Sequence, residues 1–162
     1  MPGASTSGGR GRGAHERGRA PFSYAMLRVV PRIERGERFN AGVVVFCRQR
    51  RFLGVRIELD EQRLRALAPD VDADGVRRHL AALERVAAGD PEAGPIAALH
   101  PSERFGWIVA PSSTIVQPSE VHTGLSDDPA RTLDTLFAEL VARPVGPVAP
   151  PVEPVTPPRM DT

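Results

Sequence analysis

The stretch "RFNAGVVVFCRQRRFLGVRIEL", residues 38–59, decides the fold. Residues 38–47 contain a continuous apolar run, which predicts a strand that is buried on both of its faces. "RQRR" (48–51) is polar enough to be a turn, and residues 52–59 then alternate in the manner of a second strand. Because the connection is so short, the two strands are expected to pair antiparallel.

The chain on either side of this hairpin extends the sheet. "PFSYAMLRVVPRI" (21–33) is rich in strand-forming residues and ends at the turn "ERGE", where Gly36 can adopt a positive φ. "RFGWIVA" (104–110) and "STIVQ" (113–117) are two further strand candidates. We therefore expect an α+β fold: a small, mainly antiparallel sheet of about four to five strands with helices packed on one face.

Three helices are expected from their caps and their periodicity. Asp60 can cap a short helix over 61–67, and either Asp70 or Asp72 can begin a longer one that runs to about residue 88 and stops at Gly89. Asp128 can cap a third, with Pro129 at its first position. That third helix has the most regular apolar stripe in the chain: Leu133, Leu136, Phe137, Leu140 and Val141.

Composition divides the chain into three parts. Residues 1–20 are a Gly/Arg-rich leader and residues 143–162 a Pro-rich tail, and both are expected to be disordered, whereas residues 21–142 form a single α+β domain. The formal net charge is only +1, and residues 21–142 hold 15 Arg against 17 acidic residues. A nucleic-acid partner is therefore not the expectation, although an Arg/Gly leader can contact RNA.

Residue usage excludes several chemistries and predicts a location. All 21 cationic residues are Arg, so a Walker-type phosphate loop, a Schiff-base enzyme, a Ser–Lys hydrolase and a carboxylate–Lys nuclease are excluded in their usual forms. Cys47 is the one cysteine, which suits a reducing compartment and is expected to be buried. The chain has no apolar signal region, and its longest apolar run (41–47) is too short to span a bilayer. We expect a soluble, cytoplasmic protein without a membrane partner.

Polar residues gather in "PSSTIVQPSEVHTGLSDDP", residues 111–129. Ser113 or Ser119, His122, and Asp127 or Asp128 carry the groups of a nucleophilic triad, but no G-x-S-x-G elbow surrounds either serine. The stretch is interpreted as a structured loop in which the Ser, Thr and Asp side chains satisfy backbone groups. No zinc pattern is present and no cofactor is predicted, while a single metal held across loops stays an alternative.

A second polar cluster lies at the turn "ERGERFN" (34–40). It is either a solvated hairpin turn or, if Glu37 and Asn40 lie beside His122, one wall of a small polar pocket at the sheet edge. Arg48, Arg50 and Arg51 could add a patch for anions, because guanidinium groups suit phosphate and carboxylate. A plain solvated turn is the alternative for these residues.

"YAMLRVVPRIERGERFNAGVVVFCRQRRFL" (24–53) and "SERFGWIVAPSSTIVQPSEVHTGLSDDP" (102–129) resemble a bacterial family known as domain of unknown function 3037. The resemblance covers about residues 22–142. It implies no established activity, but it implies a partner that resembles HipA-type kinases. Ser112 departs from the Arg expected after "VAP". The family-like positions are Gly36, Glu37, Asn40, Gly42, Ser113, Gln117, Pro118, Ser119, His122, Thr123 and Gly124.

Three functions remain open from the sequence. The first is an uncharacterised accessory or protein-interaction module, possible partner of a HipA-like kinase. The second is a hydrolase or nuclease-like enzyme that uses His122 with Glu37 or Asp127. The third is an RNA- or DNA-binding protein acting through the Arg/Gly leader. The candidate binding residues are Asn40, Ser113, Gln117, Ser119 and Thr123.

Overall fold

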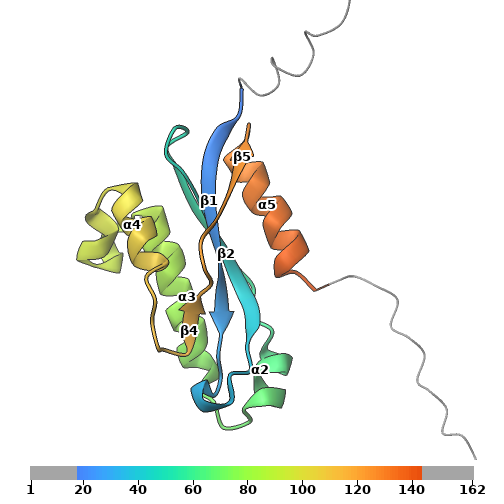
Figure 1. The fold of residues 1–162 in the computed structure, drawn as a ribbon. Coiled ribbons are helices and arrows are strands. Elements are labelled where there is room, and N and C mark those ends of the chain that lie inside the picture. Colours follow the sequence, from blue (N-terminus) through green and yellow to red (C-terminus); the bar gives the residue numbers. More distant parts are fainter. Residues whose placement is uncertain (1–17, 144–162) are drawn as a thin grey trace, which may run out of the picture.

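A long strand, β1 (Ala20–Val29), runs through the middle of the sheet in the computed structural model, which describes residues 18–143 (Figure 1). β2 (Phe39–Cys47) pairs with it antiparallel, and β3 (Phe52–Ile57) pairs antiparallel with β2. The expected meander of three strands is therefore confirmed. Its turns use a positive φ, of 70° at Gly36 and 51° at Arg51.

Two short strands share the other side of β1. β5 (His122–Ser126) pairs with the first half of β1, and β4 (Val116–Pro118) pairs with its last three residues. The two strands therefore follow one another along β1 and together form one edge of the sheet. The expectation of an α+β fold with an antiparallel sheet of four to five strands is confirmed.

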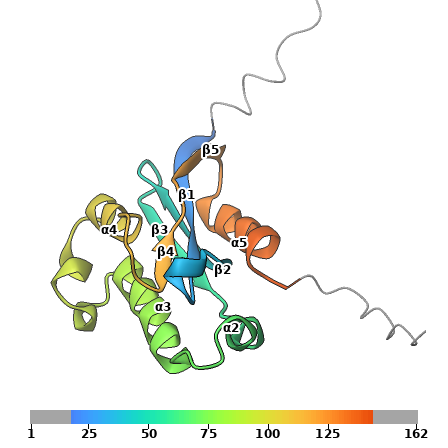
Figure 2. The same ribbon diagram turned by 60° about the horizontal axis from the view of Figure 1, so that its bottom comes forward.

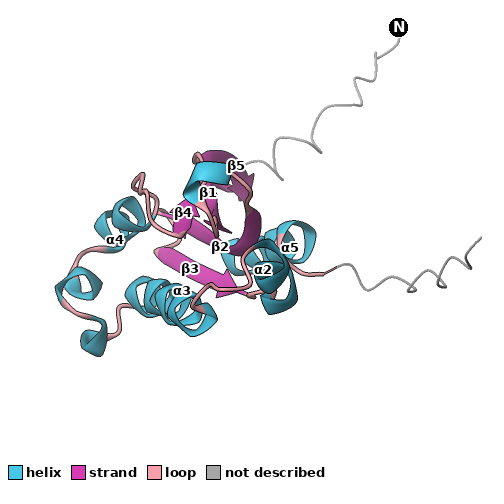
Figure 3. Ribbon diagram, turned by 90° about the horizontal axis from the view of Figure 1, so that it is seen from below, coloured by secondary structure: helices cyan, strands magenta, loops and turns pink. Residues whose placement is uncertain are grey.

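Helices cover both faces of the sheet, whereas one covered face was expected. α2 (Glu61–Leu67), α3 (Ala73–Ala88) and α4 (Pro101–Ile108) pack on one face, and α5 (Pro129–Leu140) packs on the other (Figures 2 and 3). The cause lies in β2. Its apolar run places Val44 in the core under α3, and places Val43 and Val45 in a second core under α5. A strand that is apolar on both faces needs a helix on each.

The expected helix boundaries are confirmed by their caps. Asp60 accepts the backbone N–H of Arg63 at the start of α2, and Asp72, one of the two candidates, accepts that of Gly75 at the start of α3. α3 ends at Gly89, whose φ is 71°. The remaining helical turns are three short 3-10 helices: η1 (Ile33–Arg35), η2 (Pro91–Ala93) and η3 (Pro95–Ala98).

The strand expected over residues 104–110 is instead the helix α4, so that prediction was wrong. Pro101 occupies the first helical position, where its missing N–H costs nothing. The side chains of His100 and Glu103 form a capping box in front of it. These start signals determine the helix more strongly than the strand propensity of "WIV". In the segment expected to be a strand over 113–117, the strand itself begins only at Val116, after a first hydrogen bond from the N–H of Val30 to the carbonyl of Ile115.

Two expectations depend on parts of the chain that lie outside residues 18–143. The disordered leader falls mostly on residues 1–17 and the Pro-rich tail mostly on residues 144–162, so both stay predictions. Within the described residues Cys47 is buried, as expected. No helix described between these limits has both the length and the apolar character to cross a bilayer.

Candidate functional site

Ser119 lies between β4 and β5, and its hydrogen bonds hold the backbone there in place. It is 5 % exposed. Its hydroxyl accepts the N–H of Met26 at 2.9 Å and donates to the carbonyl of Glu120 at 2.8 Å, while its own N–H donates to the carbonyl of Met26 at 2.8 Å. The hydroxyl thus replaces a carbonyl of the β-ladder where the edge strand is interrupted. The hydroxyl therefore donates and accepts within its own surroundings.

Other polar residues of the stretch 111–129 also satisfy the backbone, as predicted. The hydroxyls of Ser112 and Thr114 donate to the carbonyl of Val116 at 3.2 and 2.8 Å. The amide of Gln117 donates to the carbonyl of Thr114 at 3.0 Å. Asp128 accepts two N–H groups at the start of α5. The interpretation as a loop is incomplete, however, because β4 and β5 lie within the stretch.

The candidate catalytic residues are spread along β1. His122 is exposed and stacks on Tyr24, with 5.1 Å between ring centroids. Glu37 precedes β2, which meets β1 at Val29, so it lies roughly five strand residues away, on the order of 17 Å. Asp127 follows the opposite end of β5. The structure therefore does not bring His122 together with either carboxylate.

Glu37 and Asn40 have partners of their own. Arg35 donates two hydrogen bonds to Glu37, and this lowers the pKa of the carboxyl below its usual value. The side-chain amide of Asn40 donates to the carbonyl of Leu140 at 3.0 Å and so fixes the end of α5 against the sheet. Neither residue lies beside His122, and the polar pocket considered for them does not form. Ser113 and Thr123 are exposed.

The edge formed by β4 is closed to further strands. Pro118 has no N–H to offer, and the carbonyl of Val116 already accepts the hydroxyls of Ser112 and Thr114. The opposite edge strand of the sheet, β3, carries Arg56, which is ion-paired with Asp134 of α5. Proline and charged side chains on edge strands are common means of preventing unwanted pairing.

The edge formed by β5 is open among residues 18–143, since β1 is the one strand there that pairs with it. Leu125 faces Pro21, which has no N–H, so this pair is not of the doubly hydrogen-bonded kind. By the alternation of the ladder, Thr123 and Leu125 direct their N–H and C=O groups outward. Two apolar side chains accompany them, because Leu125 is 58 % and Val121 is 44 % exposed.

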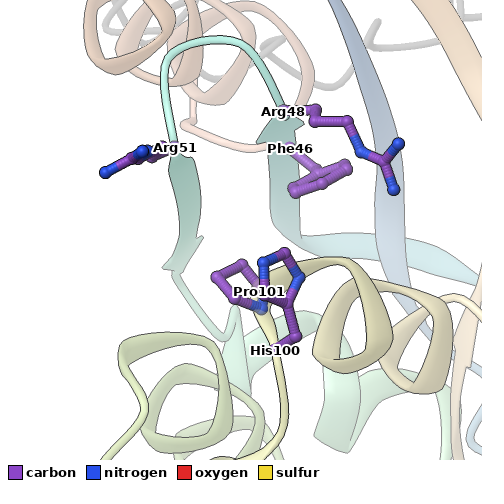
Figure 4. A pocket seen from close by; sticks show the side chains of 5 residues that line it. All are labelled: Phe46, Arg48, Arg51, His100 and Pro101. Atoms are coloured by element: carbon purple, nitrogen blue, oxygen red, sulfur yellow. The ribbon is translucent and has the colours of Figure 1, made fainter.

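A separate hollow of about 650 Å³ lies between the β2–β3 turn and the start of α4 (Figure 4). Phe46 points into it from β2, and His100 and Pro101 face Phe46 from the other side. Arg48 and Arg51 border it, with guanidinium groups that extend to opposite sides. Sequence reasoning identified the arginines as a possible anion patch but missed the aromatic wall, because α4 was expected to be a strand.

Metal ligands do not gather within the described part of the chain, where no group of three or more His, Cys, Asp or Glu side chains could hold an ion. A smaller groove of about 310 Å³ lies between α3, α4 and β4. It is mostly apolar and is bordered by Trp107, whose side chain is 47 % exposed. Ser112 and Thr114 line this groove with hydroxyls that the backbone already occupies.

Comparisons with known proteins give one family. No curated protein and no solved structure matches the chain. The family described as "Protein of unknown function (DUF3037)" matches residues 24–141, which is 118 of the 162 residues. The match includes β2 to β5, all of β1 except its first four residues, and every helix in the part of the chain that the structure describes. The chain belongs to this family of proteins of unknown function, DUF3037.

Proposed function

We propose that this protein is an accessory, protein-interaction module that binds an extended segment of a partner protein along β5. The open edge of β5, with Val121 and Leu125 exposed beside it, is the observation that carries the proposal. Exposed edge strands pair readily with other chains, and proteins usually protect them. Here β4 and β3 carry such protection, while β5 does not.

Strand addition supplies both affinity and selectivity. Outward backbone groups of Thr123 and Leu125 would form main-chain hydrogen bonds with the added strand. Val121, Thr123 and Leu125 alternate with His122 and Gly124, so their side chains lie on one face of the new pair. Burying Leu125 fully would contribute roughly 1 to 2 kcal/mol, because part of its side chain is already covered.

The proposal also names a class of partner. The family resemblance implies a kinase that resembles HipA, and this kinase is the first bait to test. The enzyme hypothesis gains no support from the geometry, since His122, Glu37 and Asp127 lie apart along β1. A protein that works by presenting an edge strand needs no such cluster.

The test is co-purification of the full chain from its host with three variants. Leu125→Glu places a charge on the open edge, and Thr123→Pro removes an outward N–H at a position where an edge strand tolerates proline. Ile33→Glu is the matched control, because Ile33 is 51 % exposed and lies on η1, away from β5. The partner's affinity should fall at least about tenfold for the first two variants and stay unchanged for the control.

Reconstitution with the purified partner then decides the occupant. A one-to-one complex that Leu125→Glu disrupts and Ile33→Glu preserves supports the proposal. Equal binding by all variants contradicts it. A homodimer that Leu125→Glu disrupts, measured by light scattering, would instead assign the edge to a second copy of this chain.

A further inference from the structure

Among the described residues, three cationic side chains without an ion pair lie close together at the β2–β3 turn. Residues 18–143 contain as many Arg as acidic residues, 17 of each. Eight of these Arg form ion pairs with described acids, but Arg48, Arg50 and Arg51 at the β2–β3 turn form none with any described acid. Charge that is balanced over the whole described chain is therefore not balanced locally at this turn.

The same turn meets the N-terminal end of β1. A guanidinium nitrogen of Arg50 donates to the carbonyl of Gly18 at 2.6 Å, and the exposed Arg19 follows directly. Gly18 and Arg19 belong to the leader, whose sequence also contains Arg10, Arg12 and Arg17. Gly18 and Arg48 are 30 residues apart in sequence, and the fold places the β2–β3 turn beside the start of β1.

An aromatic side chain lies beside these cations in the hollow of about 650 Å³. Phe46 is half-buried, and its ring is held by stacking on Phe105, with 5.2 Å between centroids and 20° between planes. The rest of the ring faces the hollow, opposite His100 and Pro101 (Figure 4). A planar ligand group can therefore lie between Phe46 and the start of α4.

We infer that this end of the protein binds single-stranded nucleic acid, with a base against Phe46 and backbone phosphates on Arg48 and Arg51. Aromatic platforms flanked by cationic side chains are the common means of binding single strands without sequence preference. Arg48 and Arg51 extend to opposite sides of Phe46, so they reach two different phosphates along a strand rather than one phosphate together. This divergence of the two guanidinium groups favours an oligonucleotide as the ligand over a free nucleotide.

The test is fluorescence anisotropy with labelled 12-nucleotide RNA and DNA, using the full chain over a range of salt concentrations. Each phosphate contact to a single strand adds about −0.7 to the slope of log K against log salt. The double variant Arg48→Gln/Arg51→Gln should therefore make the slope shallower by about 1.4. Arg65→Gln/Arg78→Gln, on α2 and α3, removes the same charge elsewhere and should leave the slope unchanged.

Phe46→Leu tests whether a base stacks on the aromatic ring. It keeps an apolar side chain against Phe105 and removes the stacking surface, so binding should weaken about fivefold or more at constant salt slope. Circular dichroism and thermal unfolding confirm that each variant folds. A mononucleotide should bind far more weakly than the 12-mer, and a poly-glutamate peptide should not compete.

Several results would overturn the inference. One is the absence of oligonucleotide binding at low salt. A second is oligonucleotide binding that the Arg48/Arg51 and Phe46 variants leave intact. A third is binding that only Arg10→Gln/Arg12→Gln/Arg17→Gln abolishes, because the nucleic-acid contact would then belong to the leader alone. A mononucleotide as tight as the 12-mer, or equal competition by poly-glutamate, would also exclude a single strand as the ligand.

Discussion

Replacement of Ser119 by Ala should destabilise the protein at the junction of β4 and β5. The alanine keeps the backbone pairing of residue 119 with Met26 but removes the hydroxyl that accepts the N–H of Met26 at 2.9 Å. The site is 5 % exposed, so water has little access to take the place of the hydroxyl. A buried donor left without an acceptor costs about 1–3 kcal/mol.

The midpoint of this range, about 2 kcal/mol, converts into a measurable shift in melting temperature. At about 2.1 cal/mol/K per residue, residues 18–143 unfold with an entropy of roughly 0.26 kcal/mol/K near the midpoint. The melting temperature of Ser119→Ala should then fall by about 8 °C. Urea titration gives the free energy of unfolding directly, and hydrogen exchange should show faster exchange of the Met26 amide in particular.

Ser113→Ala is the matched control, because Ser113 lies in the same stretch and is exposed. Its free energy of unfolding should stay within about 0.5 kcal/mol of the parent value. The reasoning is refuted if Ser119→Ala is as stable as Ser113→Ala, or if the Met26 amide keeps its protection. A loss of partner binding in Ser119→Ala without any loss of stability would point instead to a direct binding role for the hydroxyl.

Three further predictions concern stability. Asp128→Ala removes the acceptor for two N–H groups at the start of α5 and should lower the free energy of unfolding in urea by about 1 kcal/mol. Gly89→Ala should cost about 1–2 kcal/mol by the same measurement, because φ is 71° there and the added Cβ would approach Arg104. Arg85 donates to Asp90 and lowers the pKa of that carboxyl below its ordinary 3.8. The resulting stabilisation of the folded protein is present above pH 3.8 and is lost as the pH falls through the lower native pKa. In Asp90→Asn, the free energy of unfolding should therefore depend less on pH in this acidic range than it does in the parent protein.

Local signals were enough to predict most of the fold. The apolar run 41–47, the turn at 48–51 and the Asp caps each act within a few residues, and each prediction built on them is confirmed. The failure at residues 104–110 has a local cause too, since the strand propensity of "WIV" was given more weight than Pro101, which starts a helix when it occupies the first turn. β5 was missed because "HTGLS" has little strand propensity, and its pairing with β1 determines its structure.

The candidate sites depend on contacts that the sequence does not express. His122 and Glu37 are both near β1, but the register of the strands places His122 opposite Tyr24 in the middle of β1, whereas Glu37 lies near its end at Val29. In the same way, Phe46 and His100 lie 54 residues apart and meet only because α4 begins beneath the β2–β3 turn. Residue type indicates which side chains could bind or catalyse, whereas the topology determines which of them lie together.

Several family-like positions have a structural explanation, and this narrows where function can lie. A Cβ on Gly42 would come within 2.9 Å of the carbonyl of Arg56, and one on Gly124 within 2.7 Å of the ring of Phe22. Asn40 and Ser119 satisfy backbone groups. Gly124 allows the ring of Phe22 to lie across β5, which covers one face of that strand. Packing therefore accounts for the inner side of β5, while nothing in the described chain accounts for the exposed Leu125, and this contrast is the physical reason to look for a partner at that edge.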